Sequence, residues 1–114
     1  MIDLKNLITI APFPEDVKTQ VISSMDTLSE EAKIELENLA WSALSEQLRD
    51  RIALETQTAF MEVAQGIKKP EDVDPDKIEE NLFNELVSKM DGLDTEEQIE
   101  EVRGKLLSQT PQSN

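Results

Sequence analysis

Carboxylates are the reactive groups that this sequence offers, because it contains 25 Asp and Glu residues but no His and no Cys. The absence of both residue types removes imidazole bases, thiolate nucleophiles, disulfides and the usual ligands of zinc, haem and copper. A catalytic carboxyl group needs a pKa that burial or a partner has shifted. Only Glu37 and Glu55 fall on an apolar helix face, where such a shift is conceivable. We therefore predict no enzymatic activity, no cofactor and no metal.

Three aspartates at alternate positions form the best candidate metal site. Asp72, Asp74 and Asp76 have the ligand spacing with which a calcium-binding loop of the EF-hand type begins. Such a loop then needs glycine at its sixth position and a bidentate glutamate at its twelfth. Lys77 and Phe83 occupy those positions here. We interpret the aspartates instead as capping groups for the helix that follows.

The element that must position any functional group is Ser29–Gln65, a stretch of 37 residues without Pro or Gly. As a single helix it would be roughly 55 Å long at about 1.5 Å per residue. A compact monomer of this length has a radius of gyration near ~13 Å and a diameter of roughly 35 Å. The helix therefore bends, or the molecule is elongated, or a second chain covers the overhang.

Two apolar stripes run along this helix when its residues are placed about 100° apart. A helix that is apolar on opposite sides is central in a bundle, or faces both its own chain and a partner. Glu37, Arg51 and Glu55 interrupt the pattern, and either a bend or a two-fold axis near the middle would explain them. The first stripe comprises Ile34, Trp41, Leu44, Leu48, Ile52, Ala59 and Val63, and the second comprises Leu36, Leu39, Ala43, Leu54, Met61 and Ala64.

The remaining chain predicts short helices around the long one, so the fold class is all-α. We expect a small bundle of four helices organised around one long central helix, with a bend near its middle as an alternative. The domain covers 1–107, and a polar tail at 108–114 is expected to be disordered. Within the domain we predict an N-terminal arm at 1–13, helices at 14–25 and 29–65, and a helical hairpin of 75–90 and 95–107.

Capping residues mark the ends of these helices. Ser29 is a good N-cap for the long helix, although Thr27 with Glu30 forms a competing capping box. Gly66 is a natural C-terminal cap. Thr95 with Gln98 forms a capping box for the last helix.

The N-terminal arm permits two conformations and two positions. Asp3 is placed to cap a short helical turn, whereas Leu7-Ile8-Thr9-Ile10 also suits an extended strand. The arm either docks on a partner or lies over its own core, and we favour its own core.

The net charge of −14 is spread along the chain and limits the partners. No segment offers a basic face, so binding to nucleic acid and to anionic membrane surfaces is disfavoured. We expect a cytoplasmic protein, because no secretory segment and no apolar run of membrane-spanning length is recognisable. A protein partner with a basic surface remains compatible with this charge.

The function that these observations favour is a non-catalytic assembly or protein–protein interaction module, with a homodimer as the expected assembly. Trp41 is an interface candidate as well as a core candidate, since its size suits either place. The alternative function is an acidic regulator or inhibitor that occupies a basic site on a partner, including nucleic-acid mimicry. The candidate interface residues are Trp41, Leu44, Leu48, Ile52, Arg51 and Glu55.

Overall fold

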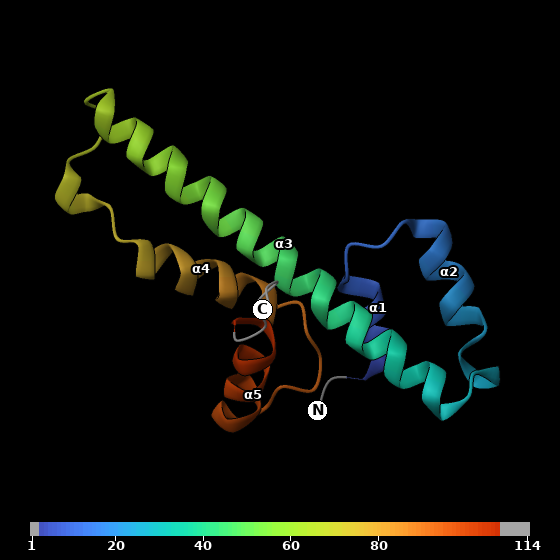
Figure 1. Ribbon diagram of the computed structural model, residues 1–114. Coiled ribbons are helices and arrows are strands. Elements are labelled where there is room, and N and C mark those ends of the chain that lie inside the picture. The colour runs from blue at the N-terminus through green and yellow to red at the C-terminus, as the bar shows by residue number, and fades with distance from the viewer. Residues whose placement is uncertain (1–2, 108–114) are drawn as a thin grey trace, which may run out of the picture.

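The computed structural model describes residues 3–107, and in that range the chain is all-α, with helices and turns but no strand. The predicted tail at 108–114 lies outside the described residues. The prediction of an all-α fold around one long central helix is confirmed (Figure 1). The helices are α1 (Leu4–Ile10), α2 (Glu15–Ser23), α3 (Glu30–Ala64), α4 (Pro75–Val87) and α5 (Glu96–Leu107), with 3₁₀ turns η1 (Met25–Thr27) and η2 (Pro70–Asp72).

Helix α3 makes the molecule elongated. Its 35 residues form one uninterrupted α-helix, which Figure 1 shows running the length of the molecule without a sharp bend. The described chain measures 56 × 31 × 30 Å, and its radius of gyration is 16.8 Å. A compact chain of this size would have a radius near ~13 Å. The sequence left three possibilities for so long a helix, namely a bend, an elongated molecule or cover by a second chain. The single chain is elongated.

Both ends of α3 are fixed by local capping. The hydroxyl of Ser29 accepts a hydrogen bond from the backbone N–H of Ala32 at 3.1 Å, so Ser29 is the N-cap rather than Thr27. At the other end Gly66 has φ +80°, and the Ile67 N–H donates to the Glu62 carbonyl at 2.8 Å. This left-handed turn satisfies carbonyls of the last helical turn.

The two C-terminal helices also begin at the predicted caps. The Asp74 carboxylate accepts hydrogen bonds from the N–H groups of Asp76 and Lys77, which confirms the capping interpretation of that aspartate. At the start of α5 the Thr95 hydroxyl accepts from the Gln98 N–H, and the Gln98 side chain accepts from the Thr95 N–H, both at 3.2 Å. The capping box is therefore confirmed. Helix α4 ends at Val87, before the predicted residue 90.

The N-terminal arm forms a fifth helix instead of an extended segment. Asp3 caps α1 by accepting from the Asn6 N–H at 2.8 Å. Leu7 and Ile8 are fully buried, and α1 packs against α3. The interpretation that the arm covers its own core is therefore confirmed. The count of four helices was too low, because local sequence left α1 open to either conformation.

Helices α4 and α5 both pack on α3. Helix α4 lies antiparallel to the C-terminal half of α3, since Arg51 contacts Glu85 near the end of α4 while Ala59 and Ile78 line one small cavity near its start. Helix α5 lies against the middle of α3, where the Ser45 hydroxyl bonds to its last turn.

Arg103 of α5 contacts α4. It binds Glu80 of α4 at 3.0 Å, and its guanidinium lies 4.2 Å from the centre of the Phe83 ring. Each of the two C-terminal helices packs chiefly on α3, and Arg103 also links them to each other.

The core lies between α1, α4, α5 and one side of α3. Most of the first predicted stripe enters it, whereas Ile34 near the start of α3 is 58% exposed. The remaining core consists of Leu, Ile, Val, Met and Ala with one Phe, as the scarcity of aromatic residues predicts. The buried core residues are Leu7, Ile8, Ala11, Ala40, Trp41, Leu44, Leu48, Leu82, Phe83, Met90, Val102 and Leu106.

Candidate protein-binding surface

The second apolar stripe of α3 is largely bare, and we call it the outer face. It comprises the predicted residues Leu36, Leu39, Ala43, Leu54, Met61 and Ala64, and Ala32 extends it towards the start of α3. Leu39, Leu54 and Met61 are 59%, 62% and 53% exposed. Such exposure of three large apolar side chains on one side of one helix is unusual for a protein surface and is typical of binding sites.

The outer face is bare because the short helices lie elsewhere. Helices α1, α4 and α5 are the elements that pack substantially against α3. They cover its first stripe, which we call the inner stripe. Figure 1 shows α2 beside the N-terminal half of α3, away from α4 and α5. No buried residue lies in α2 itself. The described chain is too short to surround a helix of this length on both sides.

The N-terminal half of the outer face is hollow, and we call this hollow the α2 groove. It has a volume of about 450 Å³. Its floor and walls are mainly apolar, with Glu35 as the charged residue. The lining residues are Gln20, Val21, Ser24, Leu28, Ala32, Glu35, Leu36 and Leu39.

A second hollow, the central groove, follows along the same face and has a volume of about 520 Å³. Pro12 and Phe13 of the α1–α2 connection form one wall. Ala43 and Leu54 stand at its two ends, one small and one large. The other lining residues, all on α3, are Glu46, Gln47, Asp50 and Arg51.

Most of the interface residues predicted from sequence lie in the core of the single chain. Trp41, Leu44 and Leu48 are 3%, 0% and 4% exposed, and Ile52 is half-buried against the same core. The chain's own α1, α4 and α5 cover them. For Trp41 the core interpretation is therefore confirmed, and these four side chains are not available to a second folded chain. Sequence identified both stripes correctly but could not tell which one the chain itself would cover.

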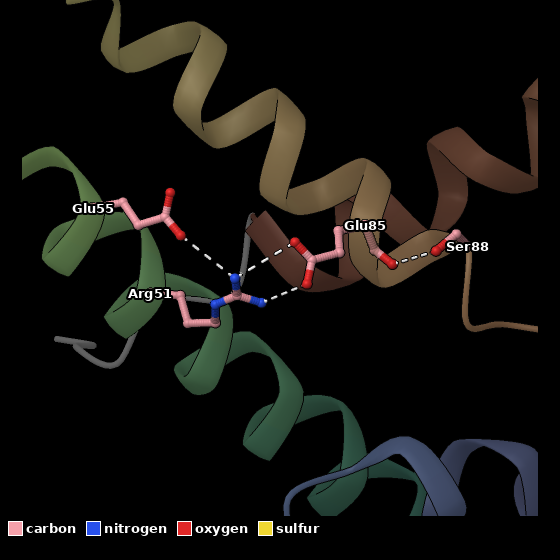
Figure 2. Close-up of polar contacts among 4 residues, drawn as sticks. All are labelled: Arg51, Glu55, Glu85 and Ser88. Carbon is pink, nitrogen blue, oxygen red and sulfur yellow. Dashed lines mark hydrogen bonds and ion pairs between the residues drawn. The ribbon is translucent and has the colours of Figure 1, made fainter. Parts of the chain in front are cut away.

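The polar interruption of the inner stripe is explained by α4. Figure 2 shows Arg51 between Glu55 on its own helix and Glu85 on α4. Its guanidinium donates to the two Glu85 carboxylate oxygens at 3.0 and 3.5 Å and to Glu55 at 3.5 Å. Neither a bend nor a two-fold axis is needed to accommodate Arg51 and Glu55, because the contact is made within one chain.

This contact shifts the pKa of both main partners. The hydrogen bond from Arg51, and then its positive charge, lower the pKa of the Glu85 carboxyl. The hydrogen bond to Glu85 raises the pKa of the Arg51 guanidinium in turn. Both groups are accessible to solvent, so water screens the attraction and the pair contributes modestly to stability.

Trp41 and Glu37 border a small cavity with α5. Its volume is about 20 Å³, far below the roughly 300 Å³ at which ligand pockets begin. The indole N–H of Trp41 is buried without a hydrogen-bond partner among the described residues. The Lys105 ammonium lies 5.6 Å from the centre of the indole ring.

The described part of the chain offers neither a metal-holding cluster nor a helix suited to crossing a membrane. Residues 3–107 contain no group of three or more acidic, His or Cys side chains arranged to hold a metal ion. Within the same residues no helix, α3 included, combines the length and the apolar character that crossing a membrane requires. Exposed acidic residues occur on all four of α2, α3, α4 and α5. Examples are Glu15, Glu30, Glu80 and Glu96.

Comparison of the chain with protein families, with curated proteins and with solved structures finds no match. The exposed outer face of α3 is therefore the feature that bears on function.

Proposed function

We propose that this protein is a non-catalytic assembly module that binds protein through the outer face of α3, and that its partner there is a second copy of itself. The exposure of Leu39, Leu54 and Met61 on that face is the observation that carries the proposal. Burying three such side chains would be favourable by roughly 1.5–3 kcal/mol each before the costs of association.

The acidic surface and the shape of the face support this proposal over an inhibitor that mimics nucleic acid. Mimicry requires a dense acidic face, and the acidic residues here are distributed over several helices. The outer face instead offers a long apolar stripe with two hollows, a form that suits a helix laid along it. A second α3 is such a helix, and a two-fold arrangement would cover the outer faces of both copies at once.

Light scattering at micromolar concentration tests the proposal. A mass twice the 12.9 kDa of one chain is expected, and Leu54→Asp is expected to return it to that of the monomer without loss of helical content. Ile34→Asp is the matched control, because Ile34 is on the same helix and 58% exposed but lies on the other stripe. A monomer mass at every concentration tested, or equal effects of the two variants, would contradict the proposal.

A further inference from the structure

We infer that two copies pair with their α3 helices antiparallel, related by a two-fold axis that passes between Leu48 and Arg49. This inference rests on the proposed self-association and adds its direction and register. Two independent features of the chain, one of shape and one of charge, require an axis at nearly the same point.

The shape of the outer face differs between its two halves. The N-terminal half carries the α2 groove, with Leu36 on its floor, and the C-terminal half carries the projecting side chains of Leu54 and Met61. A parallel pair would set hollow against hollow and projection against projection. An antiparallel pair places Met61 of one copy over Leu36 of the other.

The central groove is self-complementary about the same axis. With the axis between Leu48 and Arg49, Leu54 of one copy lies opposite the small Ala43 of the other. The large side chain of Leu54 then fills the end of the partner copy's groove, where the small Ala43 leaves space. The same register sets Glu46 of one copy beside Arg51 of the other, and 43% of the Arg51 side chain is still exposed after its contact with Glu85. Opposite charges therefore meet on both flanks of the axis.

The ends of α3 provide the second feature. The chain has only 11 basic residues, yet Lys68 and Lys69 are adjacent in the exposed loop that follows α3. Glu30 and Glu31 are exposed in the first turn of the same helix. In the antiparallel register the lysine loop of one copy lies at the start of α3 in the other, so these charges attract. A parallel pair would bring glutamates to glutamates and lysines to lysines.

Cross-linking of engineered thiols tests the direction, since the native chain has no Cys to interfere. Ala43→Cys and Leu54→Cys are prepared separately and treated with a short bis-maleimide, alone and as an equimolar mixture. Within one helix these positions are about 16 Å apart. The mixture is expected to give at least tenfold more covalent dimer than either variant alone. Dimer formation by Ala43→Cys alone, as in a parallel pair, would overturn the inference.

A charge exchange tests the register by a different readout. Lys69→Glu is expected to raise the dissociation constant of the dimer about threefold or more, and the double variant Lys69→Glu with Glu31→Lys is expected to restore it. Lys5→Glu, which makes the same change in net charge at an exposed site on α1, is the control.

The two proposals fail in distinguishable ways. A wild-type mass of one chain overturns self-association and this inference together. A dimer that gives no cross-link in the thiol mixture, or one that the double charge variant fails to restore, overturns the antiparallel register alone.

Discussion

The hydroxyl of Ser45 donates a hydrogen bond to the backbone carbonyl of Leu106, a residue 61 positions later in the chain. Ser45 is also the one buried polar side chain of the described residues, and its oxygen accepts a hydrogen bond from Arg49 at 2.7 Å. The Leu106 carbonyl lies in the last described turn of α5. One small side chain thus binds the backbone of α5 and fixes this helix on the middle of α3.

Replacement of Ser45 by alanine should therefore destabilise the fold. Ser45→Ala leaves the buried Leu106 carbonyl without its partner, and we expect the free energy of unfolding to fall by about 1–3 kcal/mol. Urea unfolding followed by far-ultraviolet circular dichroism measures it. Thr58→Ala, at an exposed site on the same helix, should lower the free energy of unfolding by less than about 0.5 kcal/mol. Equal effects at the two sites would contradict this account of Ser45.

Substitution of Leu48 distinguishes a core residue from an interface residue. It is 4% exposed in the core of the single chain, so Leu48→Asp places a charge where nothing can solvate or pair with it. Because small domains are stable by only about 5–15 kcal/mol, we expect unfolding and not dissociation into folded monomers. Circular dichroism should show loss of helix, whereas Glu30→Ala at an exposed site should leave the helical content unchanged. A helical, folded Leu48→Asp monomer would mean that this side of α3 is not the core.

Trp41 gives a test of the unpartnered indole N–H. Phenylalanine removes no hydrogen bond at this position, because the N–H has no partner among the described residues. We expect Trp41→Phe to cost only about 1–2 kcal/mol from lost volume, below the roughly 3–5 kcal/mol typical of Trp→Ala. Thermal and urea unfolding of Trp41→Phe and Trp41→Ala compare the two costs. A Phe variant as unstable as the Ala variant would indicate that the indole N–H makes a hydrogen bond that stabilises the fold.

The contact between Arg51 and Glu85 predicts a pH dependence. The pKa of Glu85 is lowered in the folded state, so the contact stabilises the fold fully above the unfolded-state pKa near 4.5 and less as the pH falls through the lower, folded-state value. Wild type should therefore be more stable than Glu85→Gln at pH 7, and the difference should vanish in acid. Urea unfolding at a series of pH values measures it. Glu71→Gln, at an exposed carboxyl that forms no ion pair within residues 3–107, serves as the control. A difference that is the same at pH 7 and at pH 2 would contradict the contact.

Asp50 provides a test of the inferred two-fold axis. In the antiparallel pair the two Asp50 side chains come close to the axis and repel each other, and neutralisation removes that repulsion. We expect Asp50→Asn to lower the dissociation constant of the dimer about threefold or more, as measured by sedimentation equilibrium. Asp76→Asn on α4, which packs against the other stripe of α3, makes the same change in net charge and should act less. Weaker association of Asp50→Asn would contradict the placement of the axis.

Much of this structure follows from local sequence. The absence of Pro and Gly from 29–65 and the caps at Ser29 and Gly66 define α3 almost to the residue, because capping and helix continuity depend on neighbours a few positions apart. The caps at Asp74 and Thr95 place α4 and α5 in the same way. The spacing of apolar residues likewise reveals two stripes on α3.

The tertiary structure decided what local spacing leaves open. Which stripe is covered depends on where α1, α4 and α5 dock, and this turned Trp41, Leu44 and Leu48 from interface candidates into core. The partner of Arg51 is 34 residues away, and that of Ser45 is 61 residues away. Residues so far apart meet only when the chain is folded, so no repeat or spacing along the sequence predicts these contacts. The same packing leaves Leu54 and Met61 bare, and the candidate binding surface is therefore a property of the fold.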